Sequence, residues 1–536
     1  MATAIVLQTV LSPVVYSAES VDPGKLKTSK QSVYVDLFDQ GLYEEGVQFL
    51  RLGDLFRKVT FKKPAAWDIN IFEEVPDSAF FTNRHAKKPL SPTELLEGSG
   101  GPAPKPGKWT VTHGKVNGIN PGFFIKDETG QEFILKFDPI DYSELSTAAE
   151  AISSRIFHAI GYYVPTYHVV KFRLDDLQVD PQASYYNEHG FKRLLTKEKV
   201  QDLLLFVAKG SDDFYRASAS TVFDGTVKGP FDMDGYRKSD PQGQTPHRYL
   251  RAVRALRVFA SWVNYYDLRS GNTMDVIQSV DGTPALRHYV TDFATTLGSA
   301  ANDVKPPQFG YEHVFDFGEF FKSVFSFGFW EKPWQKRWNE NNRTVETPSM
   351  GYFDNRHFDP GKWKSRLPYH AFKDLTASDG YWAAKIIMSF KDEDIEALVK
   401  SGQLSDSKVR EILVKILVER RNLIGRYWFE KSCPIDQFEI SKESNGFKVQ
   451  GTDLLVHYGL DSAEHRYKYH VLKSNFQREQ AGPSIVLDES SLSQFSNPFT
   501  LAIQARGLNA KWSKPVYLTL RKEAGTLKLV GIKRGL

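Results

Sequence analysis

The spacing of apolar residues changes twice along the chain, and these changes limit the folds open to it. Between Trp109 and Phe137 apolar and polar residues alternate in short runs typical of β-strands. Helical spacing follows in a segment that begins at Thr245 and again from Tyr369 to Phe429, and alternation returns after Cys433. This order predicts an α+β protein in which residues 433–536 form a separate β domain.

Turn and capping signals locate the first elements. A loop rich in glycine and proline at residues 97–107 marks a boundary, so we expect residues 1–107 to be an N-terminal extension and linker. A helix-like run at Val47–Phe56 is the one regular element expected within it. The elements expected after the boundary are strands at Trp109–His113, Phe123–Lys126, Glu132–Phe137 and Tyr167–Phe172, with a helix between Thr147 and Gly161.

Charge and cysteine content exclude several classes of protein. The 69 Lys and Arg residues are interspersed with 65 Asp and Glu residues, so no concentrated basic surface for nucleic acid is expected. Cys433 is the only cysteine, which excludes an intrachain disulfide and a zinc site built from several cysteines. No run reaches the roughly 20 apolar residues of a membrane span. The apolar segment at residues 4–16 suits an export signal or a strand, so cytoplasmic and exported locations both stay open.

Three glycines, Gly114, Gly118 and Gly122, are spaced four residues apart between the first two expected strands. Glycine allows the backbone amides of a hairpin to approach phosphate closely, because it carries no Cβ atom. Hairpin loops also use glycine for turn geometry alone. The loop by itself therefore does not identify a phosphate site.

Lys136 lies within an apolar strand. Alternation places Phe133, Leu135 and Phe137 on one face of this strand and Ile134 with Lys136 on the other. A lysine in such a strand needs a charged partner or a polar cleft, unless the strand is at an edge and the lysine reaches solvent. This segment alone does not show whether the strand lies at the edge or in the interior of its sheet.

Glu150 is placed on the following helix, where it suits an ion pair with Lys136. Its spacing from Thr147 also fits a capping box, in which the glutamate accepts a hydrogen bond from the backbone of the capping residue. The two interpretations compete at this position.

Three side chains with oxygen atoms follow the second long helix. Asn272 comes five residues after Asp267, and after a hairpin a further strand ends at Asp292. Carboxylate and amide oxygens are ligands of Mg²⁺, and an Asp that does not bind the metal can accept a proton from a substrate hydroxyl. Taken separately, each of these segments also fits a structural role, such as an Asp in a turn or an Asn that caps a helix.

The order of these features resembles the protein-kinase-like superfamily. A glycine hairpin, a strand lysine, a helix glutamate, Asp-x-x-x-x-Asn and a strand Asp-Phe follow one another over about residues 109–298. The segment is more similar to the divergent bacterial HipA-like and phosphatidylinositol-kinase-like proteins than to ordinary protein kinases. The resemblance implies a bilobal protein-kinase-like fold, with a β-rich N-lobe at residues 108–185, a helical C-lobe at residues 186–432 and the C-terminal β domain.

The resemblance also implies a role for each site residue. Lys136 would hold the α- and β-phosphates of ATP, and Glu150 would orient that lysine. Asp267 would be the catalytic base, and Arg269 would stabilise the transferred phosphate. The expected ligands of Mg²⁺, with Mn²⁺ as a substitute, are Asn272 and Asp292, and the other expected nucleotide contacts are Gly114, Lys115, Gly118, Gly122 and Ile134.

The sequence departs from the superfamily at two positions that bear on regulation. Tyr265-Tyr266 replaces the His-Arg pair that usually precedes the catalytic base, so an arginine that binds a phosphorylated activation loop is not expected here. Ala294 replaces the glycine that usually follows Asp-Phe, which restricts the backbone at that point. The expected function is Mg-ATP-dependent phosphoryl transfer to an alcohol, and the acceptor is not specified.

Two alternatives belong to other functional classes. The first is a pseudokinase or nucleotide-binding scaffold with the same fold. The second is an exported carbohydrate-associated protein, in which Asp267 and Asp292 act as a carboxylate pair. In that second case the aromatic rings expected to stack on sugars are Trp330, Trp334 and Trp338.

Overall fold

A computed structural model gives the fold of the chain. It describes residue 24 and residues 26–29, 37–43, 63–115, 122–187, 191–210, 212–237, 245–332, 334–335, 348–507 and 511–535. The apolar segment at 4–16, the helix-like run at Val47–Phe56, Gly118 and Trp338 lie outside these ranges.

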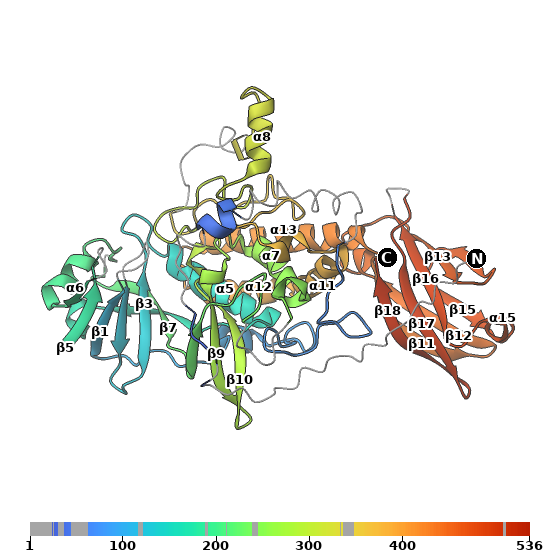
Figure 1. The fold of residues 1–536 in the computed structure, drawn as a ribbon, viewed down its shortest axis with the longest axis horizontal. Coiled ribbons are helices and arrows are strands. Elements are labelled where there is room, and N and C mark those ends of the chain that lie inside the picture. The colour runs from blue at the N-terminus through green and yellow to red at the C-terminus, as the bar shows by residue number, and fades with distance from the viewer. Residues whose placement is uncertain are drawn as a thin grey trace.

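The described residues form three large hydrophobic cores, which lie in a row (Figure 1). A sheet lies at one end, helices occupy the centre, and a second β-rich part lies at the other end. The predicted α+β class is confirmed, and the C-terminal strands have a core of their own that begins at Cys433.

The first sheet has seven strands in the order β4-β7-β3-β2-β1-β5-β6. All neighbouring pairs are antiparallel except β1 with β5. Helix α6 (Lys197–Leu204) joins the last two strands in sequence and packs on the same core. The strands are β1 (Trp109–Lys115), β2 (Gly122–Lys126), β3 (Glu132–Phe137), β4 (Tyr167–Phe172), β5 (Leu177–Tyr186), β6 (Lys192–Leu194) and β7 (Tyr215–Thr221).

The expected boundary at residue 185 falls inside this sheet. Strand β7 comes 29 residues after β5 ends, yet it lies between β3 and β4 in the middle of the sheet. Its sequence, Tyr-Arg-Ala-Ser-Ala-Ser-Thr, has no large apolar residue inside it, so it gives a weak strand signal. The β-rich part therefore extends to about residue 221.

Helix α5 (Leu145–Ile160) connects β3 to β4 and is buried along almost its whole length. It begins two residues before the expected start, because Asp138 caps it: the carboxylate accepts from the backbone N–H groups of Glu144, Ser146 and Thr147. The predicted capping box of Thr147 with Glu150 is therefore wrong, since the Thr147 hydroxyl donates to Asp138 instead. The Glu150 carboxylate takes no part in a capping box and pairs with another residue.

Helix α7 (Arg251–Val263) is the central helix of the second core. It starts six residues after the expected start at Thr245, because residues 247–249 form a separate 3₁₀ turn. Asp68 caps α7 through the backbone N–H groups of Arg251 and Ala252, at 2.5 and 3.0 Å. The other central helices are α4 (Pro92–Glu97), α10 (His370–Lys373), α11 (Ala377–Met388), α12 (Asp392–Lys400) and α13 (Ser407–Lys431).

A three-stranded sheet is formed by one strand before α7 and two strands after it. Strand β8 (Thr226–Gly229) pairs with β9 (Thr273–Val280), which pairs with β10 (Thr283–Val290) in an antiparallel hairpin. The hairpin turns at Asp281-Gly282, where both residues have positive φ, as a two-residue turn requires. This hairpin was expected from the sequence and is confirmed.

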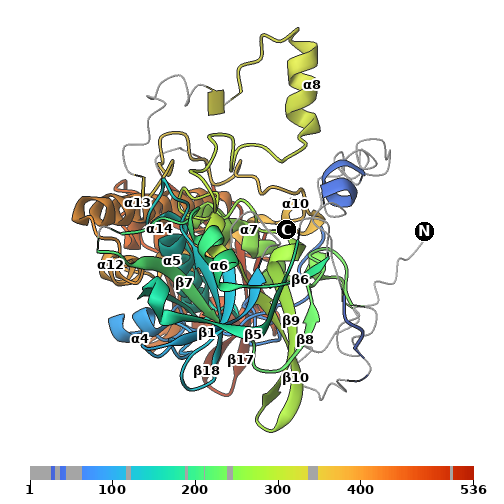
Figure 2. The same cartoon turned by 90° about the vertical axis from the view of Figure 1, so that its left-hand side faces the viewer.

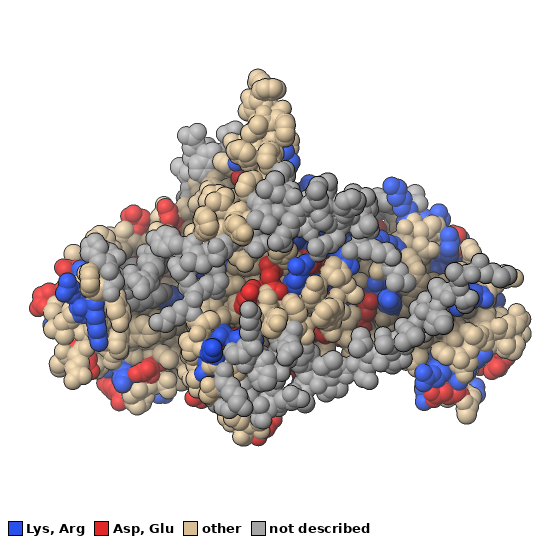
Figure 3. Space-filling view, in the orientation of Figure 1, with Lys and Arg blue, Asp and Glu red and all other residues tan. Residues whose placement is uncertain are grey.

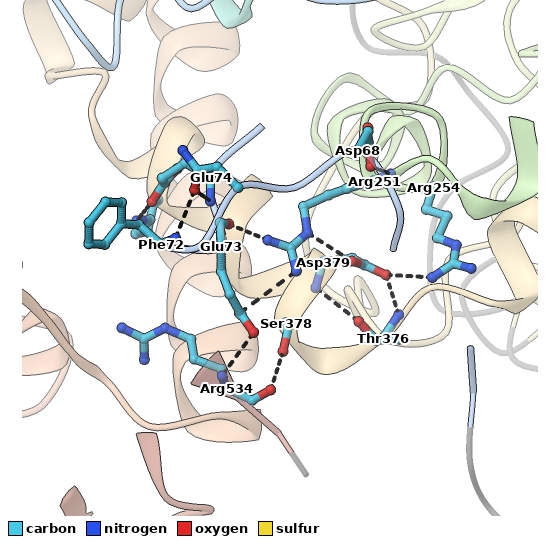
Figure 4. Close-up of polar contacts among 12 residues, drawn as sticks. Asp68, Phe72, Glu73, Glu74, Arg251, Arg254, Thr376, Ser378, Asp379 and Arg534 are labelled. Atoms are coloured by element: carbon cyan, nitrogen blue, oxygen red, sulfur yellow. Dashed lines mark hydrogen bonds and ion pairs between the residues drawn. The ribbon is translucent and has the colours of Figure 1, made fainter. Parts of the chain in front are cut away.

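Residues 63–97 pack into the central core and do not form a linker. Val75, Phe81 and Leu95 are buried against the helices of that core. Arg251 on α7 donates to Asp379 on α11, and the backbone N–H of Arg534 in the last strand donates to Glu73 (Figure 4). The segment before the expected boundary thus joins the centre to the C-terminal part.

The C-terminal part contains two antiparallel sheets, in the orders β11-β12-β15 and β14-β13-β16-β17-β18. Their facing side chains form its core. The elements are β11 (Ile435–Glu443), β12 (Gly446–Asp453), α14 (Leu454–His457), β13 (Arg466–Val471), β14 (Gln477–Gln480), β15 (Ser484–Asp488), α15 (Glu489–Gln494), β16 (Phe499–Arg506), β17 (Val516–Glu523) and β18 (Thr526–Arg534).

Helix α8 (Phe317–Phe325) projects away from the body of the molecule (Figure 2). A short π-helical turn, η1 (Leu37–Tyr43), lies at the surface. On the face drawn in Figure 3, basic and acidic side chains lie close to one another over much of the part that is described. Within the described ranges no helix has the length and apolar character that a membrane span requires.

Candidate functional site

Lys136 projects from the face of the first sheet that is turned toward α5. In the strand register it lies opposite Gly122 of β2 and Ser218 of β7. Paired residues point to the same face, so the neighbours of Lys136 are a glycine and a serine. Phe133, Leu135 and Phe137 are buried on the other face, as alternation predicted.

The ammonium group of Lys136 contacts two carboxylates from distant parts of the chain. Its Nζ atom is 2.5 Å from Oε1 of Glu150 on α5 and 2.8 Å from Oδ1 of Asp292 beyond β10. Glu150 also accepts a hydrogen bond from the hydroxyl of Ser218. The ion pair expected between Lys136 and Glu150 is confirmed, and the edge-strand alternative for the lysine is wrong, because β3 has neighbours on both sides.

Burial and charge act in opposite directions on this cluster. Burial lowers the pKa of Lys136, but the carboxylates of Asp292 and Glu150 overcome that effect and hold its pKa well above the usual range. The lysine is therefore charged at neutral pH. One ammonium faces two carboxylates, of which Asp292 has 40% of its side chain exposed. The cluster can accept a further cation from the open side.

The hairpin of β9 and β10 brings Asn272 next to Asp292. Thr273 at the start of β9 pairs with Val290 at the end of β10, and the backbone N–H of Thr291 donates to the carbonyl of Asn272 at 2.9 Å. Asp292 has φ of +60°, a conformation that is strained for most residues but tolerated by Asp. The turn directs its carboxylate toward Lys136.

Asp267 lies in the loop that leaves α7. The Nδ2 group of Asn272 donates to the backbone carbonyl of Asp267 at 2.7 Å and to its carboxylate at 3.0 Å. Two arginines also contact this carboxylate: Arg366 at 2.9 Å and Arg269 at 3.4 Å. Because both hydrogens of Nδ2 are used, Oδ1 is the atom through which Asn272 can bind a cation.

Comparisons with protein-family models, with curated proteins and with solved structures found no match. The chemistry open to the site therefore follows from its own contacts. These contacts gather a charged lysine, three acidic side chains and an asparagine from β3, α5, the α7 loop and the β9–β10 hairpin.

The side chains at this site suit a magnesium ion that binds together with a ligand carrying phosphate. Among the described residues, no group of three or more His, Cys, Asp and Glu side chains could hold a metal ion. Mg²⁺ is commonly held by one or two protein carboxylates together with substrate phosphates and water, so Asn272 and Asp292 suffice in that setting. Lys136 beside them supplies the positive charge for a phosphate.

The other expected nucleotide contacts are placed differently. Gly122 and Ile134 lie on the same face of the sheet as Lys136, and Lys115 pairs with Gly122 in the register. Gly114 lies on the opposite face, where a Cβ atom would come within 3.1 Å of Tyr185. Close packing explains that glycine, and the structure does not bring it to the site.

Several residues at the site were not identified from the sequence. The backbone N–H of Asp292 donates to the Tyr167 hydroxyl, and the Tyr265 hydroxyl donates to the carbonyl of Thr291. Ser218 holds Glu150, and Arg366 holds Asp267. Through its contact with Thr291, Tyr265 supports the turn at Asp292.

Two of the three indoles considered for sugar stacking lie within the described residues, and each is hydrogen-bonded to a carboxylate. The indole N–H of Trp330 donates to Glu319, and that of Trp334 donates to Glu312. The two indoles are therefore anchored to different acidic side chains near the base of α8. Lys322 and Lys332 lie over their rings, which further limits access of a sugar to those faces.

Proposed function

We propose that this protein is a Mg-ATP-dependent phosphotransferase of protein-kinase-like fold that acts on an alcohol. The single observation that carries the proposal is the contact of Lys136 with both Glu150 and Asp292. Glu150 and Asp292 lie 14 and 156 positions after Lys136 in the sequence, yet the charged atoms of the three residues meet in one cluster. That pattern matches the order of residues in the kinase-like superfamily.

Each residue would contribute by position and charge. Lys136 would bind phosphate oxygens, and Asn272 and Asp292 would hold the magnesium ion, whose positive charge would neutralise the transferred group. Glu150 keeps Lys136 oriented. Asp267 accepts the proton of the acceptor hydroxyl, and Arg269 lies beside it.

A nucleotide-binding scaffold is the second candidate, and one observation favours it. The Asp267 carboxylate accepts hydrogen bonds or ion pairs from Arg366, Arg269 and Asn272. A base engaged by three donors has fewer lone pairs for a substrate proton. A scaffold would bind Mg-ATP at Lys136 and transfer nothing.

Two variants separate these functions. Lys136→Met should remove the rise in melting temperature produced by Mg-ATP, which at 100 times Kd corresponds to about 2.7 kcal/mol. Asp267→Asn should keep that rise and lose about 10²–10⁴-fold in phosphoryl transfer. Matched controls are Lys400→Met and Asp213→Asn, whose side chains are exposed. Equal transfer by wild type and Asp267→Asn would refute the base, and no nucleotide response in wild type would refute both functions.

A further inference from the structure

A large cavity lies in the central part of the protein, at the base of α8. Its volume is about 960 Å³, which is at the upper end of the range for small-molecule sites. Its walls come from α8, from the loop at residues 309–313 and from the segment at residues 352–373. Neither Lys136 nor Asp292 lines it, so it is distinct from the proposed nucleotide site.

Positive charge dominates the cavity. Eight Lys and Arg side chains line it, against two carboxylates, Glu319 and Asp359. Glu319 already pairs with Lys322 at 2.8 Å, and Asp359 pairs with Lys362 at 3.2 Å. Lys364 and Arg356 pair with Asp316 and Asp354 outside the wall, at 2.6 and 3.2 Å, so the excess of cations is smaller than the lining alone suggests.

Arg257 and Lys63 are the clearest part of this excess. Arg257 donates to the carbonyl oxygens of Gly361 and Trp363 at 2.8 and 2.9 Å, and Lys63 donates to that of Leu375 at 2.8 Å. Backbone oxygens carry only partial charge, and the carboxylates of Asp374 and Asp359 act on Lys63 and Arg257 without a direct ion pair. Burial lowers the pKa of Lys63, and the nearby Arg257 lowers it further, as expected for two cations in one wall.

The rest of the lining suits a ring-shaped ligand. Tyr311 and Tyr352 are among the aromatic side chains of the wall. Aromatic faces pack against sugar or polyol rings, while the cations bind their anionic substituents. The combination favours a small anionic ring compound over a metal ion or an apolar ligand.

The cavity shares a wall with the loop that carries Asp267. Ser365 lines the cavity, and the next residue, Arg366, contacts the Asp267 carboxylate at 2.9 Å. Tyr369 also lines it, and the Tyr369 hydroxyl accepts from the backbone N–H of Ser270 at 2.9 Å. A ligand in this cavity therefore borders the loop that carries the proposed catalytic base, whose own side chain is not among the lining residues.

We propose that this cavity holds the acceptor, and that the acceptor is an alcohol that carries two or more phosphate or sulfate groups. The assignment rests on the proposed phosphotransferase function. The acceptor hydroxyl gives its proton to Asp267 while its oxygen bonds to the γ-phosphorus of ATP. The bond from that phosphorus to the β-phosphate oxygen breaks, so the products are a phosphate ester and ADP.

Binding can be tested without nucleotide. The full-length protein is titrated with glucose 1,6-bisphosphate, glucose 6-sulfate, inorganic phosphate and glucose, and its melting temperature is followed. We expect the bisphosphate to raise it most and glucose to leave it unchanged, and the sulfate ester shows whether phosphate is required. Arg257→Gln and the milder Lys63→Gln should each raise the Kd of the bisphosphate about tenfold or more, because each removes a charge-assisted contact. The control Lys528→Gln, at an exposed lysine of β18, should not.

Transfer is then measured with Mg-ATP for each compound that binds. We expect at least one anionic alcohol to be phosphorylated, with a higher KM in Arg257→Gln and an unchanged Kd for ATP. The acceptor assignment is overturned if no anionic compound binds, if glucose binds as well as the bisphosphate, or if Arg257→Gln and Lys63→Gln bind it normally. It is also overturned if compounds bind, ATP binds and nothing is phosphorylated. Loss of ATP binding in wild type would instead overturn the phosphotransferase function.

Discussion

Lys136 is the residue on which the site depends. Its side chain is 13% exposed and that of Glu150 is 1% exposed, so their charges are removed from most of the solvent. A buried charge is stable only when it is paired, and the removal of one partner costs more than the pair itself contributes. Asp292, at the open side, is the partner that a metal ion can share.

Glu150→Gln tests this dependence at the level of one atom. The amide keeps the size of the side chain but leaves Lys136 with one carboxylate instead of two. We expect the free energy of unfolding to fall by about 1–3 kcal/mol, measured by urea denaturation of the full chain at pH 7. Glu396→Gln, which breaks an exposed pair with Lys400, should change it by no more than about 0.5 kcal/mol. Equal effects of the two variants would contradict a buried cluster.

The residue types of the site were predictable, but the side chains that hold them in place were not. Lys136, Glu150, Asn272 and Asp292 each have a characteristic spacing within a local motif. Arg366 reaches Asp267 from 99 positions away, and Ser218 reaches Glu150 from 68 positions away. Contacts of that kind follow from tertiary packing, which no local pattern in one sequence encodes.

At the scale of elements, α5 is held from both sides. The Arg216 side chain of β7 donates to the Thr147 hydroxyl on α5 and to the carbonyl oxygens of Gly402 and Gln403, just after α12. Ser153 of α5 is hydrogen-bonded to Thr296, which follows the turn at Asp292. The helix that carries Glu150 is therefore fixed to the sheet and to the helical centre at once.

Gly402 packs closely against α5. A Cβ atom at Gly402 would lie 2.6 Å from Cδ1 of Ile152 and 3.2 Å from Cβ of Ala148. Gly402→Val should destabilise the protein by about 1–3 kcal/mol through overpacking and weaken the response to Mg-ATP, because it displaces α5. Gly482→Val, with no atom within 4 Å of its Cβ position, is the control for thermal unfolding. A variant Gly402→Val with normal stability and nucleotide response would contradict this role of α5.

The C-terminal sheets contain a separate charged element. His465 lies between Asp453 at 2.6 Å and Asp461 at 3.0 Å, and its hydrogen bond to Asp453, aided by Asp461 and opposed by burial, raises its pKa to about 9 from 6.5. Because the folded pKa is the higher one, the stabilisation is complete below about pH 6.5 and is lost as the pH rises through 9. After allowance for screening, about 1–2 kcal/mol should be lost over this range.

Measurement of the free energy of unfolding from pH 6 to 10 checks the predicted direction of this pH dependence. His465→Gln should flatten the fall in stability, whereas His457→Gln, at an exposed histidine of α14, should retain it. A wild-type protein whose stability rises between pH 6.5 and 9 would contradict the assignment.

Element boundaries were the least predictable part of the fold. Strands β3 and β4 were expected at the residues they occupy, because alternating patterns and turn residues bound them on both sides. Helices α5 and α7 start elsewhere than expected, since their caps, Asp138 and Asp68, lie outside the helices. The Asp68 cap is 183 positions from Arg251, so no local capping motif could reveal it.

At the scale of the whole molecule, the central core joins parts that composition alone would separate. Residues 63–97 precede a loop that looks like a domain boundary, yet they pack against α5 and α7. Arg534, near the end of the chain, donates to the carbonyls of Cys433 and Ile435 and lies 4.1 Å from the Tyr381 ring on α11. The C-terminal part therefore has its own core but is tied to the helices that support the site.

The proposed function requires one geometric event, the binding of phosphate to Lys136 while Glu150 stays in contact with the lysine and Asp292 holds the metal. A crystal structure with Mg²⁺ and a non-hydrolysable ATP analogue measures it most directly. We predict phosphate oxygens within hydrogen-bonding distance of the Lys136 ammonium and a metal ion bound by Asn272 and Asp292. A structure at saturating analogue in which Lys136 still contacts only Glu150 and Asp292, with the nucleotide absent or elsewhere, would contradict the proposal.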